Sequence, residues 1–274
     1  MARPITELQS AGNPLIKDVR RAVSRSATTK DGLWVAESLH LLDEAFRSRL
    51  TVRKVLASVR RRRDVEAKLR GHGDVALNVV GDDLFSELAT TETSQGVLAL
   101  VEPPKWVLGD LFKGTPLVVV LDGLQDPGNV GTIVRTAEAF GATGVVLLKG
   151  TAHAANPKTL RASAGSLFRL PHVGGLEPEE LIGEAKKRGL TCFAASSRGG
   201  KPLSQTPVER GCVIVLGSEA HGVSPGLREA SEELRIPTGA VESLNVSAAA
   251  AVVLYDAARR RAARAGGRNS KGVR

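Results

Sequence analysis

Residues 117–135 read LVVVLDGLQDPGNVGTIVR, and this stretch decides the fold of the second half of the chain. The five apolar residues Leu117–Leu121 form an unbroken run, which predicts a strand buried on both faces. A polar loop follows and leads to a helix predicted over Asn129–Phe140. The Pro-Gly-Asn turn predicts that the Asn129 side chain caps this helix by accepting from early backbone N–H groups. The stretch therefore predicts one strand–helix unit of a parallel sheet.

The same alternation continues to the end of the chain. Helices are predicted over Asn156–Gly165, Glu177–Arg188 and Pro225–Leu234, and from near Ser243 towards Ala265. Strands are predicted over Val145–Leu148, Thr191–Ala195, Val213–Leu216 and Arg235–Pro237. We therefore predict an α/β fold with a mostly parallel, helix-covered sheet, whose ligands should bind beyond the carboxyl ends of the strands.

The first hundred residues predict a second, smaller α/β domain. Short apolar strands, such as Val52–Ser58, alternate there with helices, such as Leu39–Arg47. Glu102-Pro103-Pro104-Lys105 follows, and neither proline can continue a helix or a central strand. We predict an N-terminal domain over 1–102, a linker over 103–115, a catalytic domain over 116–265 and a basic tail over 266–274.

Composition excludes several classes of protein. No run of about 18 apolar residues predicts a membrane span, and the first residues lack the apolar core of a secretory signal. The two cysteines, Cys192 and Cys212, lie in apolar strand-like runs, which is typical of reduced core cysteines in a cytoplasmic protein. Two cysteines, and five histidines without ligand spacing, predict no metal site.

The net charge of +9 points to a polyanionic partner. Residues 259–274 contain seven basic residues and no acidic one, while the middle of the chain is nearly neutral. A run of four arginines, Arg60–Arg63, begins a charged helix. Both features have a second explanation: the tail is equally compatible with a solvated terminus, and the arginine run is typical of a solvated helix start as well as of a phosphate contact.

Two further stretches resemble ligand loops. Gly217-Ser-Glu-Ala-His-Gly222 follows a strand, where a glycine lets the backbone approach a ligand. Ile236–Ser247 leads into an Ala-rich helix whose first N–H groups would face a ligand, although an Ala-rich core helix with a serine cap predicts the same pattern. Neither a P-loop nor a dinucleotide-binding glycine fingerprint is present. His221 is more typical of an exposed loop residue than of a general base.

Together the three stretches closely resemble the SpoU (TrmH-like) family of SPOUT-class RNA ribose 2′-O-methyltransferases. The matching motifs are Asn129-x-Gly131-x-x-x-Arg135, Gly217-x-Glu219-x-x-Gly222 and Ser243-Leu-Asn-Val-Ser247. Arg161-Ala-Ser-Ala-Gly165 resembles the segment between them. Asn13–Lys17 and Thr91–Val97 are similar to the family's N-terminal substrate-binding domain, which resembles kink-turn-binding ribosomal proteins. One departure is Glu37-Ser38, where relatives usually have Glu-Gly.

The resemblance implies a trefoil knot at the C-terminal end of the sheet and S-adenosyl-L-methionine as cofactor. The expected cofactor-binding residues are Leu216, Gly217, Ile236, Leu244, Asn245 and Ser247, and the expected catalytic residues are Asn129, Arg135, Glu219 and Asn245. The resemblance also implies a homodimer in which Arg135 acts on the cofactor of the other subunit.

The expected reaction is attack of a ribose 2′-oxygen on the sulfonium methyl group, for which no metal is needed. The family assigns proton removal to the arginine that matches Arg135. Because a guanidinium stays protonated, we expect Arg135 instead to hold the adjacent phosphate and stabilise the developing alkoxide. Glu219 is expected to organise the site. Ribosomal RNA is favoured over tRNA as the substrate; the alternatives are a non-catalytic RNA-binding relative and a nucleotide-cofactor enzyme on an open doubly wound sheet.

Overall fold

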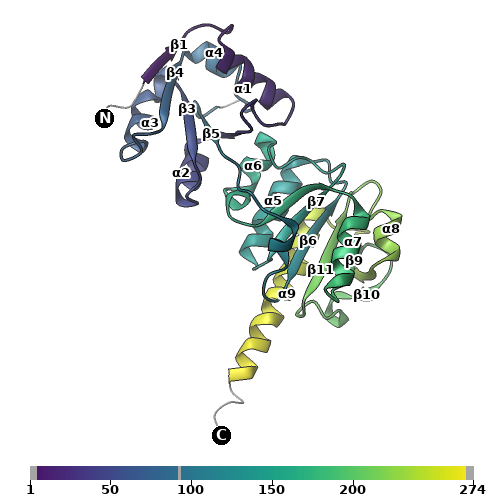
Figure 1. The fold of residues 1–274 in the computed structure, drawn as a ribbon. Helices are drawn as coiled ribbons and strands as arrows, with labels where there is room; N and C mark the ends of the chain where they lie inside the picture. The colour runs from purple at the N-terminus through teal and green to yellow at the C-terminus, as the bar shows by residue number, and fades with distance from the viewer. Residues whose placement is uncertain (1–4, 92–93, 270–274) are drawn as a thin grey trace. The chain divides into compact units, whose positions relative to one another are not determined.

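The computed structural model describes residues 5–91 and 94–269, and the side chains of residues 266–269 are not described. The chain forms two compact units (Figure 1). The first unit contains residues 1–105 together with 153–169, and the second contains 106–152 and 170–274. Residues 153–169 thus pack with the N-terminal unit, although in sequence they lie inside the segment expected to form the catalytic domain.

The first unit is built on a mixed five-stranded sheet with the order β1-β4-β3-β5-β2. Strand β5 runs antiparallel to both β2 and β3. The strands are β1 (Ile5–Leu8), β2 (Trp34–Glu37), β3 (Val52–Ser58), β4 (Ala76–Val80) and β5 (Val97–Val101). The helices are α1 (Pro14–Ser24), α2 (Leu39–Arg47), α3 (Arg62–Lys68), α4 (Asp82–Ser86) and α6 (Pro157–Ser163), with short 3-10 turns at Val59–Arg61 and Ser166–Phe168. The apolar stripe of α1, made of Ile16, Val19 and Ala22, is fully buried in the core of this unit.

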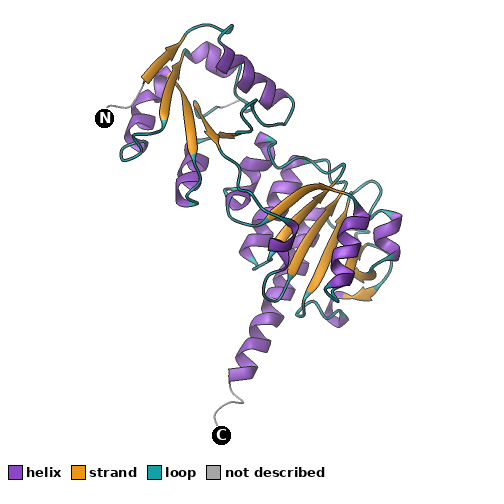
Figure 2. Cartoon of the chain, viewed as in Figure 1, coloured by secondary structure: helices purple, strands orange, loops and turns teal. Residues whose placement is uncertain are grey.

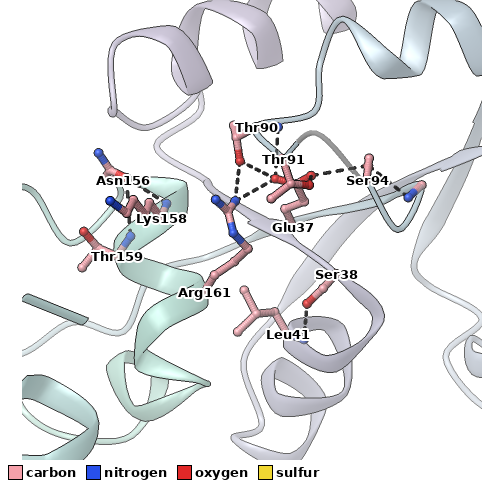
Figure 3. A network of polar contacts seen from close by, with 11 residues as sticks. Glu37, Ser38, Leu41, Thr90, Thr91, Ser94, Asn156, Lys158, Thr159 and Arg161 are labelled. Atoms are coloured by element: carbon pink, nitrogen blue, oxygen red, sulfur yellow. Dashed lines mark hydrogen bonds and ion pairs between the residues drawn. The ribbon is translucent and has the colours of Figure 1, made fainter. Parts of the chain in front are cut away.

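A buried carboxylate, Glu37 at the end of β2, is the centre of a polar network in the first unit (Figure 3). Its oxygens accept from the Arg161 guanidinium on α6 at 2.8 Å and from the Thr91 hydroxyl at 3.0 Å, and Thr90 also bonds to it. Glu37 is 2% exposed, so its charge needs these donors. The network attaches α6, from the middle of the chain, to the N-terminal sheet.

The backbone conformation near this network favours small residues at two positions, Ser38 and Gly165. Ser38 has φ +137° and ψ 159°, a region that favours glycine. Its side chain caps α2 by accepting from Leu41 N at 3.1 Å. At Gly165, with φ +90°, a Cβ atom would lie 2.8 Å from the side chain of Glu44. Glycine is therefore required at the end of the Arg161–Gly165 motif.

The arginine run of the first unit is largely neutralised within the unit. Arg60 pairs with Asp82, Arg61 with Asp64, and Arg62 with Glu66 and Glu7. These contacts support the explanation that the run is a solvated, ion-paired helix start. Glu92 and Thr93 of the expected substrate-binding motif lie outside the described residues.

The second unit is a seven-stranded sheet in which every pair of neighbours is parallel, with the order β10-β12-β9-β11-β6-β7-β8. The strands are β6 (Leu117–Asp122), β7 (Gly144–Leu148), β8 (His172–Leu176), β9 (Thr191–Ser196), β10 (Lys201–Pro202), β11 (Cys212–Gly217) and β12 (Glu232–Arg235). The helices are α5 (Pro127–Ala139), α7 (Pro178–Lys187), α8 (Pro225–Glu229) and α9 (Val246–Asn269), with 3-10 turns at Leu108–Phe112 and Leu203–Gln205. This arrangement confirms the predicted mostly parallel, helix-covered sheet.

Helices cover both faces of this sheet (Figure 2). Val118 and Val120 of β6 pack in one apolar cluster with Leu181 of α7 and Leu227 of α8. Because side chains alternate along a strand, the intervening Val119 faces the opposite side, where α5 and α9 pack together. All five apolar residues of the run are therefore buried.

Three expected elements differ from the structure. Pro225–Leu234 was expected to be one helix, but α8 ends at Glu229 and residues 232–235 form β12 at the sheet's edge. Pairing with β9 overrides the helical pattern there, and the strand expected at Arg235–Pro237 lies earlier. The last helix begins at Val246 and not near Ser243.

Arginines in the second half of α9 bond to backbone carbonyls in the segments that precede β6 and β11. Arg261 donates to the carbonyls of Thr115 and Pro116 at 3.0 and 2.9 Å, and Arg260 donates to those of Leu203 and Thr206. Part of the basic excess of residues 259–274 therefore serves the fold. Residues 270–274 of the expected tail lie outside the described residues.

Both cysteines are free and buried. Burial raises the pKa of the Cys192 thiol above its ordinary value and raises the pKa of the Cys212 thiol to about 11. Within residues 5–91 and 94–269, no helix is both long and apolar enough to cross a membrane. The same residues contain no cluster of three or more His, Cys, Asp or Glu side chains that could hold a metal ion.

Candidate active site

The three motifs of the second unit meet at the carboxyl end of its sheet through one pair of hydrogen bonds. The Asn129 amide donates from Nδ2 to Glu219 Oε1 at 2.8 Å, and Asn245 Nδ2 donates to Asn129 Oδ1 at 3.4 Å. Asn129 lies in the first turn of α5, Glu219 follows β11, and Asn245 precedes α9. Three of the four expected catalytic residues are thus brought together.

Asn129 is available for this contact because Asp126 caps α5. The Asp126 carboxylate accepts from Gly128 N at 3.2 Å and from Asn129 N at 3.1 Å. The expectation that Asn129 is the cap was wrong: an aspartate three residues earlier satisfies the first N–H groups of the helix. The Asn129 side chain can therefore point to Glu219.

Asn245 has two roles at once. Its Oδ1 accepts from the backbone N–H groups of Ser247 at 2.9 Å and Ala248 at 3.4 Å, which caps α9. The Ser247 hydroxyl donates to the same oxygen at 2.6 Å. The amide nitrogen of Asn245 is left for Asn129, so the start of α9 is tied to the start of α5.

A cavity of about 260 Å³ opens beside this cluster. Four of the six expected cofactor-binding residues line it: Leu216, Gly217, Ile236 and Leu244. Asn245 and Ser247 do not line the cavity and instead form the cap of α9. Leu244 and Ala249, on either side of this cap, do line the cavity. The cavity lining mixes apolar side chains, such as Leu216, Ile236 and Leu244, with polar ones, such as Ser218 and Glu219. Apolar contacts combined with hydrogen-bonding groups suit a nucleoside-like ligand.

Gly217 shows how closely the loops pack around the cavity. A Cβ atom at Gly217 would lie 2.1 Å from the backbone carbon of Gly222 and 2.2 Å from Val223 N. Backbone cannot move aside as a flexible side chain can, so glycine is required at this position. The narrow loop leaves main-chain groups at the cavity wall, which suits the backbone recognition expected for an adenosine.

Sequence reasoning did not identify every lining residue. Ser196 and Ser197 at the end of β9, and Thr238 after β12, also line the cavity. The rule that ligands bind at the carboxyl ends of parallel strands could have indicated the two serines. Thr238 lies within the Ile236–Ser247 stretch, but it was not singled out as a ligand-binding residue.

Arg135 is not brought to the cluster. Its side chain is exposed on α5 and makes no hydrogen bond or ion pair with any residue in the described part of the chain. Within one subunit, the fourth expected catalytic residue is therefore separate from the other three.

Comparison with known proteins agrees with this geometry. The SpoU rRNA Methylase family matches residues 116–255, and the MRM3-like substrate binding domain matches residues 13–99. The chain is 34% identical over 253 residues to the 23S rRNA (guanosine(2553)-2′-O)-methyltransferase RlmP of Bacillus subtilis, covering 91% of this chain and 98% of that protein.

Two solved structures have the same fold over nearly their whole length. The SpoU methyltransferase AviRb from Streptomyces viridochromogenes, in complex with AdoMet, gives a TM-score of 0.82 at 26% identity, covering 91% of this chain and 98% of that chain. The AdoMet-bound rRNA methyltransferase from Sinorhizobium meliloti gives 0.78 at 28% identity, covering 93% and 98%.

The fold and site define a methyltransferase of the parallel-sheet SPOUT type. The chain belongs to the SpoU rRNA methylase family, as its three motifs predicted. It is an RNA 2′-O-methyltransferase that uses S-adenosylmethionine.

Proposed function

We propose that this enzyme methylates the ribose 2′-hydroxyl of a guanosine in 23S ribosomal RNA. The observation that carries the proposal is the alignment with the Bacillus subtilis enzyme, which spans 98% of that protein and so includes the N-terminal domain. The 23S rRNA (guanosine-2′-O-)-methyltransferase RlmB of Bordetella pertussis is 33% identical over 189 residues. A tRNA substrate is the alternative outcome.

We assign cofactor binding to the cavity beside Gly217. Leu216, Ile236 and Leu244 would hold the adenosine part, mainly through backbone and apolar contacts, and Asn245 and Ser247 would shape the methionine side. When bound, S-adenosylmethionine supplies an electrophilic sulfonium methyl group. The mixed apolar and polar lining of the cavity and the absence of room for a side chain at Gly217 support this fit.

The polar cluster would position the reacting hydroxyl. Asn129 holds Glu219 in a fixed orientation, and Asn245 holds Asn129, so the three side chains form a preorganised surface at the rim of the cavity. Glu219 orients this surface. Arg135 holds the phosphate next to the target nucleotide and stabilises the alkoxide that develops as the 2′-hydroxyl loses its proton.

A homodimer would bring Arg135 into a site. Helices α5 and α9 pack side by side, and α9 exposes Val252 and Tyr255, which are 40% and 56% exposed. Tyr255 also packs edge-on against Phe140 at the end of α5. We propose that this apolar surface is the subunit interface and that Arg135 crosses it to the partner's cofactor. The family resemblance also leads us to propose the trefoil knot. The proposed rRNA substrate leads us to propose a cytoplasmic location.

A complementation experiment tests the dimer. Arg135→Ala subunits should bind S-adenosylmethionine normally but transfer no methyl group. Mixed with subunits whose cavity is blocked by Gly217→Ala, they should regain activity, because one site in each mixed dimer then has an intact cavity and the partner's Arg135. Near-normal turnover by Arg135→Ala alone, or no gain on mixing, contradicts the assignment.

The RNA target is tested by mapping ribose 2′-O-methylation at nucleotide resolution in cells with and without the gene. We expect one guanosine of 23S rRNA to lose its methyl group in the deletion strain. Loss at a tRNA nucleotide would establish the alternative, and no change in any RNA would contradict the proposal.

A further inference from the structure

A second cavity of about 510 Å³ lies next to the first in the same unit. Its walls come from Asp122 at the end of β6, from Gln125 in the loop that follows, from Gly150 after β7, and from residues around the start of α8. Ser218 and Gly222 line both cavities. The two cavities therefore share one wall, the 217–222 loop that also carries Glu219.

The shared wall is fixed by its own hydrogen bonds. Gly222 N donates to Ser218 O at 2.8 Å, and His221 N donates to Ser218 Oγ at 3.2 Å. On the α5 side, Gln125 precedes Asn129 by four residues. The second cavity therefore borders both the loop that leads into α5 and the loop that carries Glu219.

The charges of the second cavity disfavour phosphate. Asp122 and Glu229 contribute two carboxylates, and the guanidinium of Arg228 is already paired with Glu233 at 2.7 Å. A phosphate group would be repelled by this surplus of negative charge. The cavity instead suits a neutral group that is rich in hydrogen-bond donors.

Asp122 is held in place to receive such donors. Its Oδ2 accepts from Ser224 N at 2.7 Å, across 102 residues of sequence. Its Oδ1 has no hydrogen-bond partner among the residues that the structure describes. A carboxylate can accept two parallel N–H groups, and each oxygen has two acceptor positions. Asp122 therefore keeps enough capacity for a ligand.

We propose that the second cavity receives the target base and that Asp122 recognises guanine by its Watson–Crick edge. Guanine presents two adjacent donors there, N1–H and the exocyclic amine, whereas adenine, cytosine and uracil each place a donor next to an acceptor. Enzymes that do chemistry on a base read the flipped-out base by hydrogen bonds to its Watson–Crick edge, and we extend this mode of recognition to a ribose methyltransferase. The inference rests on the proposed function, because it supplies the base specificity of that site.

The test uses RNA fragments that contain the mapped methylation site, with either guanosine or inosine at that nucleotide. Inosine lacks the exocyclic amine and keeps N1–H. We expect kcat/KM of the wild-type enzyme to fall roughly 10- to 100-fold with inosine. Asp122→Asn should lower kcat/KM for guanosine by a similar factor and abolish the discrimination, because its amide presents a donor in place of an acceptor. The dissociation constant of S-adenosylmethionine should not change.

The matched control is Glu179→Gln, which removes one negative charge from an exposed position on α7, outside both cavities. It should retain full discrimination. Equal use of guanosine and inosine by the wild-type enzyme overturns the inference, and this arm holds even if Asp122→Asn does not fold. Full discrimination by a folded Asp122→Asn overturns it as well.

The two proposals fail in different ways. A discriminated guanosine outside 23S rRNA would overturn the proposed function and support the base site. A 23S guanosine that can be replaced by inosine without a fall in kcat/KM would support the proposed function and overturn the base site. A mapped nucleotide other than guanosine would overturn both.

Discussion

Asn129 Nδ2 donates to Glu219 Oε1 at 2.8 Å, across 90 residues of sequence. This bond joins the helix that follows the first strand of the parallel sheet to the loop that follows β11. Since β6 and β11 are neighbours in register, Leu121 opposite Leu216, their carboxyl ends present these loops side by side. The contact is therefore a direct consequence of the sheet's topology.

Replacement of Glu219 distinguishes an organising residue from a general base. Glu219→Gln keeps an oxygen that can accept from Asn129, so we expect kcat to fall less than about 10-fold and the pH–rate profile to keep its shape. Loss of a general base would cost roughly 10²- to 10⁴-fold and remove a limb of the profile. Steady-state kinetics over a pH series decide between them.

Asn129→Ala removes the link itself and should be more harmful. Without it Glu219 loses its orientation, and misplacement of about 1 Å can cost roughly 10²-fold in rate. We expect kcat to fall by about that factor with little change in cofactor affinity, measured by calorimetry. Activity equal to that of wild type would show that the contact does not serve catalysis.

Gly217→Ala should block cofactor binding. The new methyl group would lie 2.1 Å from Gly222 C, so the 217–222 loop must move and the cavity must change shape. We expect S-adenosylmethionine binding to fall below detection in a protein that still folds, as followed by calorimetry and circular dichroism.

Gly226→Ala is the matched control, because a Cβ atom there would contact nothing within 4 Å. Its cofactor affinity should equal that of the wild-type protein. Normal binding by Gly217→Ala would show that the loop adapts without cost and would remove the steric argument.

Ser38→Gly should stabilise the protein. Ser38 has φ +137°, and holding a non-glycine residue in this region costs about 1–3 kcal/mol. Replacing a serine cap by glycine loses only about a few tenths of a kcal/mol, and the added chain entropy of glycine offsets a further ~0.5–1 kcal/mol. We expect a net gain of about 1 kcal/mol in the free energy of unfolding, measured with urea.

Ser38→Ala separates the two effects. It keeps the unfavourable backbone conformation and removes the hydrogen bond to Leu41 N, so it should destabilise the protein by about 1 kcal/mol. A destabilised Ser38→Gly variant would show that the cap outweighs the strain.

The sheet could be predicted from the sequence because it depends on local patterns, and unbroken apolar runs identified β6 and β11. The expected roles of Asn129, Glu219 and Asn245 came from the family resemblance, and the structure brings the three side chains together. Partners distant in sequence could not be predicted in this way. That Asp126 rather than Asn129 caps α5 depends on side-chain geometry, and the pairing that makes residues 232–235 a strand depends on the neighbouring β9.

Residues 153–169 show the same limit. Their helical spacing predicted α6, but nothing local indicated that Arg161 would bond to Glu37, 124 residues earlier. The network in Figure 3 joins Glu37, at the end of β2 in the N-terminal sheet, to a helix from the middle of the chain.

Removal of Arg161 should strongly destabilise the first unit. Glu37 is 2% exposed and Arg161 24% exposed, so the pair is largely shielded from water. Arg161→Ala leaves the buried carboxylate with only the hydroxyl and N–H donors around it, and loss of one partner of a buried pair costs about 3 kcal/mol or more.

Arg61→Ala, which breaks the exposed pair with Asp64 in the same unit, should cost less than about 1 kcal/mol. The double variant Glu37→Gln/Arg161→Met should lose less stability than Arg161→Ala, because no unpaired charge remains buried. Urea unfolding of the three variants measures these differences, and equal losses for Arg161→Ala and Arg61→Ala would show that the Glu37 network does not hold α6 in place.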